Sequence, residues 1–96
     1  MRRDDVLRIL AEHREPLEAL GATNVAIFGS VARDEARPDS DVDILIDLNR
    51  PMGLLALARI HNYFEDILGN PVDVVQRKNL KQRIRQRILD EAIVAA

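Results

Sequence analysis

The most regular hydrophobic pattern in the chain lies between residues 54 and 68. Apolar side chains recur there every three or four residues, which is the spacing of one face of an α-helix. The stripe consists of Leu54, Leu57, Ala58, His61, Phe64, Ile67 and Leu68. Gly69-Asn70-Pro71 follows directly and has the residue types that end helices. The pattern predicts a helix over residues 54–68 with one buried face, on which His61 is packed rather than catalytic.

Three shorter apolar runs have the length and composition of buried strands. They lie at residues 24–28, 41–47 and 72–75. In the second run, Val42 and Ile44 are expected to point into a core. Asp41 and Asp43 then point to the opposite face of the same strand. In the third run Asp73 is the one acid among valines, and an acid inside an apolar strand indicates a candidate functional residue.

Three further segments are predicted to be helical. They lie at residues 6–20, 30–35 and 80–89. Pro16 cannot lie inside a continuous helix, so the first segment is expected to break near Arg14. Asn79 is expected to cap the last segment. Helices between and around three short strands indicate a small α/β (α+β) domain, with the helices packed mainly on one face of the sheet and the other face partly open.

Length and composition narrow the class of protein. The 96 residues are expected to form one domain, 1–96, without room for a separate substrate-binding domain. The absence of cysteine excludes disulfides and thiolate metal sites. No apolar run approaches the ~20 residues of a membrane span, and no signal-peptide pattern is present. We therefore expect a soluble, cytoplasmic protein with no membrane contact.

The charge is unevenly distributed along the chain. The net charge is −2, which argues against a general nucleic-acid binder. The C-terminal part nevertheless has a basic stretch without an acid, made of Arg77, Lys78, Lys81, Arg83, Arg85 and Arg87. In order of preference, this stretch indicates a solvated helix face, a surface for an acidic partner, or a nucleic-acid contact.

The candidate chemistry is concentrated between residues 28 and 47. Asp41 and Asp43 lie one strand step apart on one face, so their carboxylates repel each other unless a cation holds them. Such oxygen ligands suit Mg²⁺, which proteins bind through one or two carboxylates together with substrate phosphates. At Gly29 the backbone N–H groups can approach a phosphate, and a helix that begins near Ser30 presents its positive end to it. The segment predicts a site for a magnesium-bound nucleotide.

The segment resembles the signature of the nucleotidyltransferases related to DNA polymerase β. The residues that match are Gly29, Ser30, Arg33 and Ser40-Asp41-Val42-Asp43. The resemblance covers residues 17–75, and the small size is similar to that of the minimal nucleotidyltransferases, which are commonly antitoxins paired with HEPN-domain toxins. It implies the small nucleotidyltransferase fold, with a three-stranded mixed sheet.

The resemblance also implies a role for each matching position. The acids that would act in catalysis and bind Mg²⁺, as a pair of ions in the family, are Asp41, Asp43 and Asp73. The residues that would bind the nucleotide and its phosphates are Gly29, Ser30, Arg33 and Ser40.

Each of these positions also has a structural interpretation. Asp73 could be a solvated strand acid, and Ser30 could cap the short helix. Arg33 could pair with a nearby acid, namely Asp34, Glu35 or Asp39. Asp47 lies one step beyond Asp43 on the same face, and we interpret it as solvated or strand-ending and leave it out of the site.

One position departs from the family pattern. A glycine commonly follows the arginine in the family, whereas this chain has Asp34. If the chain makes a tight turn there with a positive φ, the aspartate is expected to be strained.

The small size has a functional implication within the family. Larger relatives use a further domain to present the acceptor, so a partner protein would supply it here. The implied function is transfer of AMP from Mg-ATP to a hydroxyl, of a tyrosine in the family, on a HEPN-type RNase toxin. The alternatives are an antitoxin that neutralises by occlusion alone and, less favoured, a transferase acting on a small molecule. The sequence leaves the oligomeric state open, with either a homo-oligomer of this chain or a hetero-oligomer with its partner.

Overall fold

The structure is a computed structural model that describes residues 1–95. The helices are α1 (Arg3–Glu12), α2 (Arg14–Leu20), α3 (Gly29–Ala32), α4 (Leu54–Leu68) and α5 (Gln82–Glu91), with a 3-10 helix η1 (Arg77–Asn79). The strands are β1 (Ala22–Phe28), β2 (Val42–Leu48), β3 (Val72–Gln76) and β4 (Ile93–Val94). Within residues 1–95, no helix combines the length and the apolar character that crossing a membrane requires.

The strands form one mixed sheet in the order β3-β2-β1-β4. β2 pairs with β3 in parallel, whereas β1 pairs with both β2 and β4 in antiparallel orientation. The small α+β fold and the mixed sheet are thus confirmed, but the prediction of three strands is wrong by one. The additional strand, β4, has only two residues, which pair with Ala26 and Ile27. A two-residue strand is too short to produce a recognisable pattern of its own.

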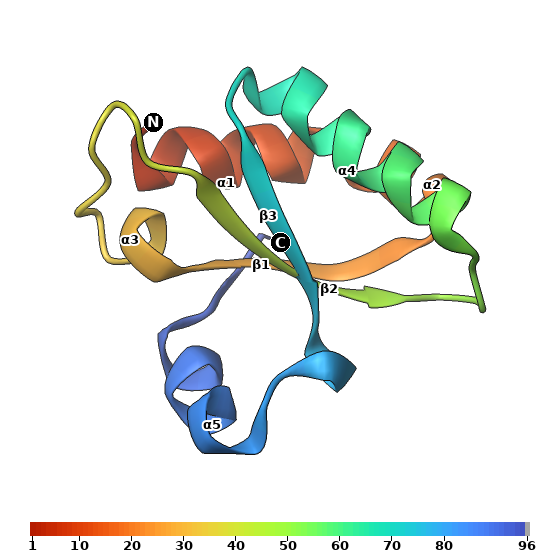
Figure 1. Cartoon of the computed structure of the whole chain (residues 1–96). Coiled ribbons are helices and arrows are strands. Elements are labelled where there is room, and N and C mark those ends of the chain that lie inside the picture. The colour runs from red at the N-terminus through yellow and green to blue at the C-terminus, as the bar shows by residue number, and fades with distance from the viewer. Residues whose placement is uncertain (96) are drawn as a thin grey trace.

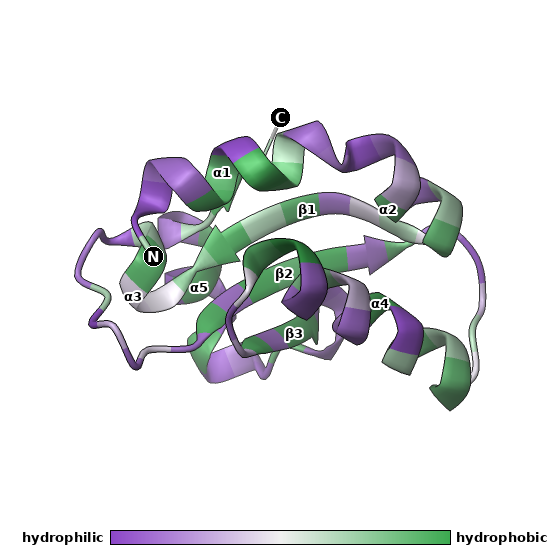
Figure 2. Cartoon of the chain, turned by 90° about the horizontal axis from the view of Figure 1, so that it is seen from above, coloured by the Kyte–Doolittle hydropathy of each residue, from purple (hydrophilic) through white to green (hydrophobic). Residues whose placement is uncertain are grey.

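The helices are distributed unequally over the two faces of the sheet (Figure 1). α1, α2 and α4 cover one face, and their side chains form the main core with the alternate residues of β2. The fully buried members include Val6, Leu10, Leu17, Ile44, Ile60 and Phe64. In Figure 2 these helices carry both apolar and polar residues, as expected when only one side of a helix is buried.

The other face is less open than the sequence suggested, because α5 packs against it. Ile88 of α5 contacts a second, smaller cluster that contains Ala26 of β1 and Leu45 of β2. α5 begins at Gln82 after the extended residue Lys81, so the predicted cap at Asn79 is wrong. The helix covers one part of this face and leaves Asp43 and Asp73 partly or fully exposed beside it.

The ends of the helices follow the sequence closely. Gly21 and Gly69 end α2 and α4 with left-handed backbone conformations, φ 110° and 66°. The predicted break near Arg14 lies at His13, so that Pro16 falls in the first turn of α2, where no backbone N–H is needed.

Asp34 has a positive φ of 59° in the turn after α3. The sequence predicts strain at Asp34 if the turn requires a positive φ. Aspartate tolerates it better than most residues, because its short polar side chain can hydrogen-bond locally. Here Asp34 Oδ1 accepts a hydrogen bond from the backbone N–H of Arg3 at 3.4 Å, which ties the turn to the start of α1.

Candidate functional site

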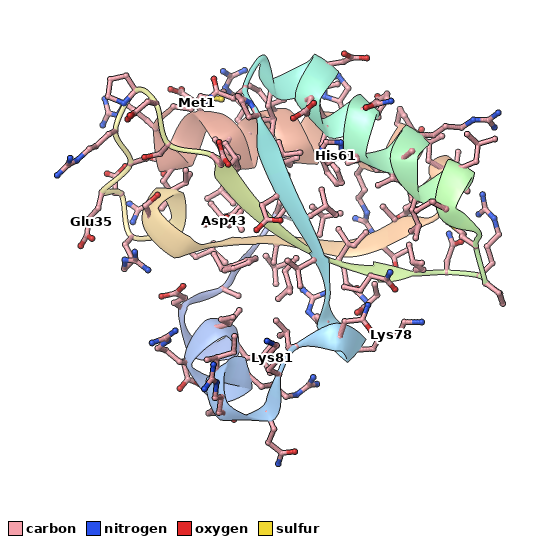
Figure 3. All side chains as sticks on the ribbon, viewed as in Figure 1. Met1, Glu35, Asp43, His61, Lys78 and Lys81 are labelled. Carbon is pink, nitrogen blue, oxygen red and sulfur yellow. The ribbon has the colours of Figure 1, made fainter. Side chains whose placement is uncertain are left out.

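Two of the predicted acids lie side by side across two parallel strands. Asp43 of β2 is in register with Asp73 of β3 and, on its other side, with Phe28 of β1. Residues in direct register point to the same face of a sheet. Asp43 can be located in Figure 3 on β2, next to β3. The third acid, Asp41, is exposed and directly precedes β2, two residues before Asp43.

The turn after β1 is in close contact with Asp43. Gly29 begins α3 with a φ of 71°, a backbone conformation that side chains rarely adopt. A Cβ atom at this position would lie 2.1 Å from Oδ2 of Asp43. Glycine is therefore required for two reasons, and the structure brings the backbone of Gly29 directly against the carboxylate of Asp43.

The acids affect one another electrostatically. Partial burial raises the pKa of Asp43 above its ordinary value, and the negative charges of Asp73, Asp41 and Glu91 raise it further. The guanidinium of Arg33 acts in the opposite direction. A cation near Asp43 would relieve this repulsion, so the donor set fits a divalent metal ion.

The acids alone do not complete a metal site. Among residues 1–95, no group of three or more His, Cys, Asp or Glu side chains is arranged to hold a metal ion. This fits Mg²⁺, which is usually held through one or two carboxylates, with the remaining ligands supplied by water and substrate phosphates.

The substitution Asp43→Asn is expected to stabilise the folded protein at neutral pH when no divalent cation is present. The raised pKa means that the folded state holds this proton more tightly than the unfolded chain. The stability that this tighter proton binding provides is fully present below pH 3.8, the ordinary pKa of the group. It is lost as the pH rises through the raised pKa of Asp43. Asparagine avoids this loss because it carries no charge. Thermal unfolding should therefore give a higher Tm for the variant at about pH 7, and a smaller difference below about pH 4.

The matched control for this measurement is Asp39→Asn, in the exposed loop before β2. It should leave the Tm unchanged at both pH values. A Tm of Asp43→Asn at or below that of the wild type at neutral pH would contradict the prediction.

The two predicted serines are placed differently. Ser30 follows Gly29 inside α3, whose N-cap is Phe28, so Ser30 is not the cap residue. Ser40 lies in the loop before β2, and its hydroxyl accepts a hydrogen bond from the backbone N–H of Arg37 at 3.0 Å. Ser30 thus remains next to the Gly29 turn, whereas Ser40 holds its own loop together.

Arg33 pairs with two glutamates, and the sequence analysis anticipated only one of them. Its Nε donates to Glu35 at 3.3 Å, and its Nη1 donates to Oε2 of Glu91 at 3.0 Å. Both hydrogen bonds raise the pKa of Arg33, and the bond to Glu91 has the larger effect. The other oxygen of Glu91, Oε1, accepts the backbone N–H of Gly29 at 2.9 Å.

Glu91 therefore contacts two residues of the candidate site, and it was not predicted from the sequence. One signal was available, because Glu91 lies three residues after Ile88 and so on the side of α5 that faces the sheet. An open hollow of about 390 Å³ lies beside this contact. It is lined by Phe28, Gly29, Arg33, Arg87, Ile88 and Glu91.

Asp47 lies on the same face of β2 as Asp43 but has different partners. Its Oδ2 accepts a hydrogen bond from Nδ2 of Asn24 at 2.9 Å. Nη1 of Arg77 lies 3.4 Å from the same oxygen. These contacts join β2 to β1 and to η1, which gives Asp47 a structural explanation.

Comparisons with known proteins agree on one family. Residues 7–95 match the family model described as a nucleotidyltransferase domain. Among curated proteins, the chain is 37% identical over 91 residues to protein adenylyltransferase MntA of Thermococcus cleftensis, covering 94% of this chain and 92% of that protein.

Solved structures have the same fold. A protein described as a minimal nucleotidyltransferase is 40% identical and superposes with a TM-score of 0.74, covering 97% of this chain and 95% of the other. A chain in the structure of a tri-AMPylated Shewanella oneidensis HEPN toxin in complex with MNT antitoxin gives a TM-score of 0.65, over 94% of this chain and 71% of the other. The identity in that case is 14%, so this likeness concerns the fold alone.

Proposed function

This chain belongs to the nucleotidyltransferase domain family, and we propose that it transfers AMP from Mg-ATP to a hydroxyl group of a partner protein. The observation that supports this most directly is the contact of Gly29 with Asp43 beside Asp73. It places a backbone turn suited to phosphates against carboxylates that repel one another. A nucleotide with its bound cation satisfies both requirements.

We assign the residues as follows. The backbone and side chains that hold the triphosphate are those of Gly29, Ser30 and Arg33, with Ser40 keeping the adjoining loop in place. The carboxylates that would hold Mg²⁺ are those of Asp41 and Asp43, and the carboxylate of Asp73 lies in register with Asp43 on the neighbouring strand. When bound, Mg²⁺ neutralises negative charge on the phosphates as the bond to the leaving group breaks.

The reaction is a displacement at the α-phosphorus of ATP. The acceptor oxygen forms a new bond to this phosphorus, the bond from it to the oxygen bridging to the β-phosphorus breaks, and pyrophosphate leaves. The acceptor hydroxyl loses its proton, and the exposed carboxylate of Asp73 is the group we assign to receive it.

The acceptor is proposed to be a tyrosine of a HEPN-type RNase toxin, which the modification would silence. Two comparisons support a protein acceptor of this type, whereas the tyrosine rests on the family resemblance alone. The curated relative from Thermococcus cleftensis is a protein adenylyltransferase, and the Shewanella oneidensis toxin in the structure with MNT antitoxin is itself AMPylated.

The test uses ATP labelled on the α-phosphate. The chain is mixed with Mg²⁺, the labelled ATP and a HEPN-type toxin protein with which it copurifies, and the modified residue is identified by mass spectrometry. Label on a tyrosine of the partner supports the proposal. A stable complex with an unlabelled partner, in the presence of ATP and Mg²⁺, would refute it.

A further inference from the structure

Glu91 contacts the two groups that the proposed function gives to the nucleotide phosphates. Its Oε1 accepts the backbone N–H of Gly29 at 2.9 Å, and its Oε2 accepts Nη1 of Arg33 at 3.0 Å. Both oxygens of the carboxylate are therefore engaged by donors in the way that two phosphate oxygens would be. The contact joins α5 to α3, two helices that are far apart in the sequence because β2, α4 and β3 lie between them.

This contact differs from an ordinary surface ion pair. The side chain of Glu91 is 23% exposed, compared with 66% for Glu35, the other partner of Arg33. In addition, Gly29 is the first residue of α3, where a backbone N–H has no acceptor within the helix. Glu91 thus satisfies a donor that would otherwise be available to a ligand.

A second position for the carboxylate lies within reach. Arg87 lines the same hollow and precedes Glu91 by four residues in α5, the spacing at which side chains on a helix meet. Among the ion pairs within residues 1–95, Glu91 pairs with Arg33 and none includes Arg87. The hollow of about 390 Å³ provides the space for such a movement.

We propose that Glu91 occupies the phosphate-binding groups of the nucleotide-free protein and that a bound triphosphate displaces it toward Arg87. This inference rests on the proposed function. It makes Glu91 a residue that opposes nucleotide binding, because the triphosphate must replace a carboxylate already held by Gly29 and Arg33. A partner that draws α5 away from α3 would then promote nucleotide binding.

The experiment compares ATP affinity in four proteins by calorimetry. They are the wild type, Glu91→Gln, Glu91→Asp and the control Asp90→Asn. Glu91→Gln removes the charge, whereas Glu91→Asp retains it on a side chain one methylene shorter. Asp90 is exposed and directly precedes Glu91, and within residues 1–95 its side chain forms a hydrogen bond only with Gln86. Asp90→Asn therefore removes the same charge without changing a contact of the site.

We expect the Kd for ATP to fall about three- to tenfold in Glu91→Gln, and by a smaller factor in Glu91→Asp. Asp90→Asn should change the Kd by less than about twofold, because an exposed charge is screened by solvent and salt. Inorganic tripolyphosphate, used as a second ligand, should give the same ranking, since the effect concerns phosphates and not the base.

The outcomes separate this inference from the proposed function. If the wild type binds ATP but both Glu91 variants bind it equally or more weakly, the displacement is refuted and the proposed function stands. An equal gain in Asp90→Asn would attribute the effect to net charge and also refute it. If none of the four proteins binds ATP or tripolyphosphate, both proposals fail.

Discussion

The double substitution Asp41→Asn and Asp43→Asn is expected to lower AMP transfer on the order of 10³-fold or more, while the protein remains folded. Both side chains keep their size but lose the charge that holds a cation against the nucleotide phosphates. Because partial burial and then the acidic neighbours disfavour the charged form of Asp43 and raise its pKa, the variant should be at least as stable as the wild type. The measurement is the initial rate of label transfer from ATP at saturating partner, with thermal unfolding recorded in parallel.

Asp47→Asn is the matched control for the double variant. Asp47 lies on the same strand and the same face as Asp43, but it contacts Asn24 and Arg77 rather than Gly29. We expect transfer within about threefold of the wild type, since Asp47 lies four residues, roughly 13 Å, along the strand from Asp43 and solvent and salt screen a partly exposed charge at that distance. Equal losses in Asp47→Asn and in the double variant would indicate a general effect of charge and would contradict the assignment of Asp41 and Asp43.

The same double variant distinguishes catalysis from occlusion. If this chain acts by transferring AMP to a HEPN-type toxin, as proposed, the variant should bind the toxin without protecting cells from it. If it acts by covering the toxin, the variant should protect cells as well as the wild type does. Complex formation, measured by copurification, must be retained for either conclusion to be drawn.

The parts of the candidate site that can be predicted from the sequence are those fixed by local pattern. Alternation along β2 places Val42 and Ile44 in the core and Asp43 on the opposite face, whatever the rest of the chain does. The glycine at position 29 follows an apolar strand and precedes a helix, and this order is visible over a few residues. Asp73 was identifiable because an acid in an apolar strand is unusual, although its register with Asp43 required the sheet itself.

The parts that the sequence did not reveal depend on distant contacts. Glu91 meets Gly29 across 62 residues, and only the path of α5 under the sheet brings them together. The path of α5 also explains why the second face of the sheet is partly covered, because it brings Ile88 against that face. From the sequence alone, Ile88 could equally have faced a partner protein. β4 was missed because two residues cannot establish a period, and their pairing depends on where α5 ends.

The substitution Gly29→Ala is expected to reduce AMP transfer far more than it reduces stability. The positive φ alone costs about 1–2 kcal/mol for a residue with a Cβ, or roughly 5–15 °C in Tm for a domain of this size. The Cβ would also lie 2.1 Å from Oδ2 of Asp43. Since this oxygen is at the end of a side chain, the carboxylate can rotate away, so the clash is relieved at the expense of the site.

Gly69→Ala isolates the contribution of the backbone. Gly69 has a φ of 66°, close to the 71° of Gly29, but an added Cβ would meet no atom within 4 Å. Both variants should therefore lose similar stability, whereas only Gly29→Ala should lose transfer activity, by about 10²-fold or more, when both are assayed below their Tm. Equal activity in the two variants would mean that the position of the Asp43 carboxylate is unimportant. That result would remove the contact of Gly29 with Asp43 as the basis of the proposed function.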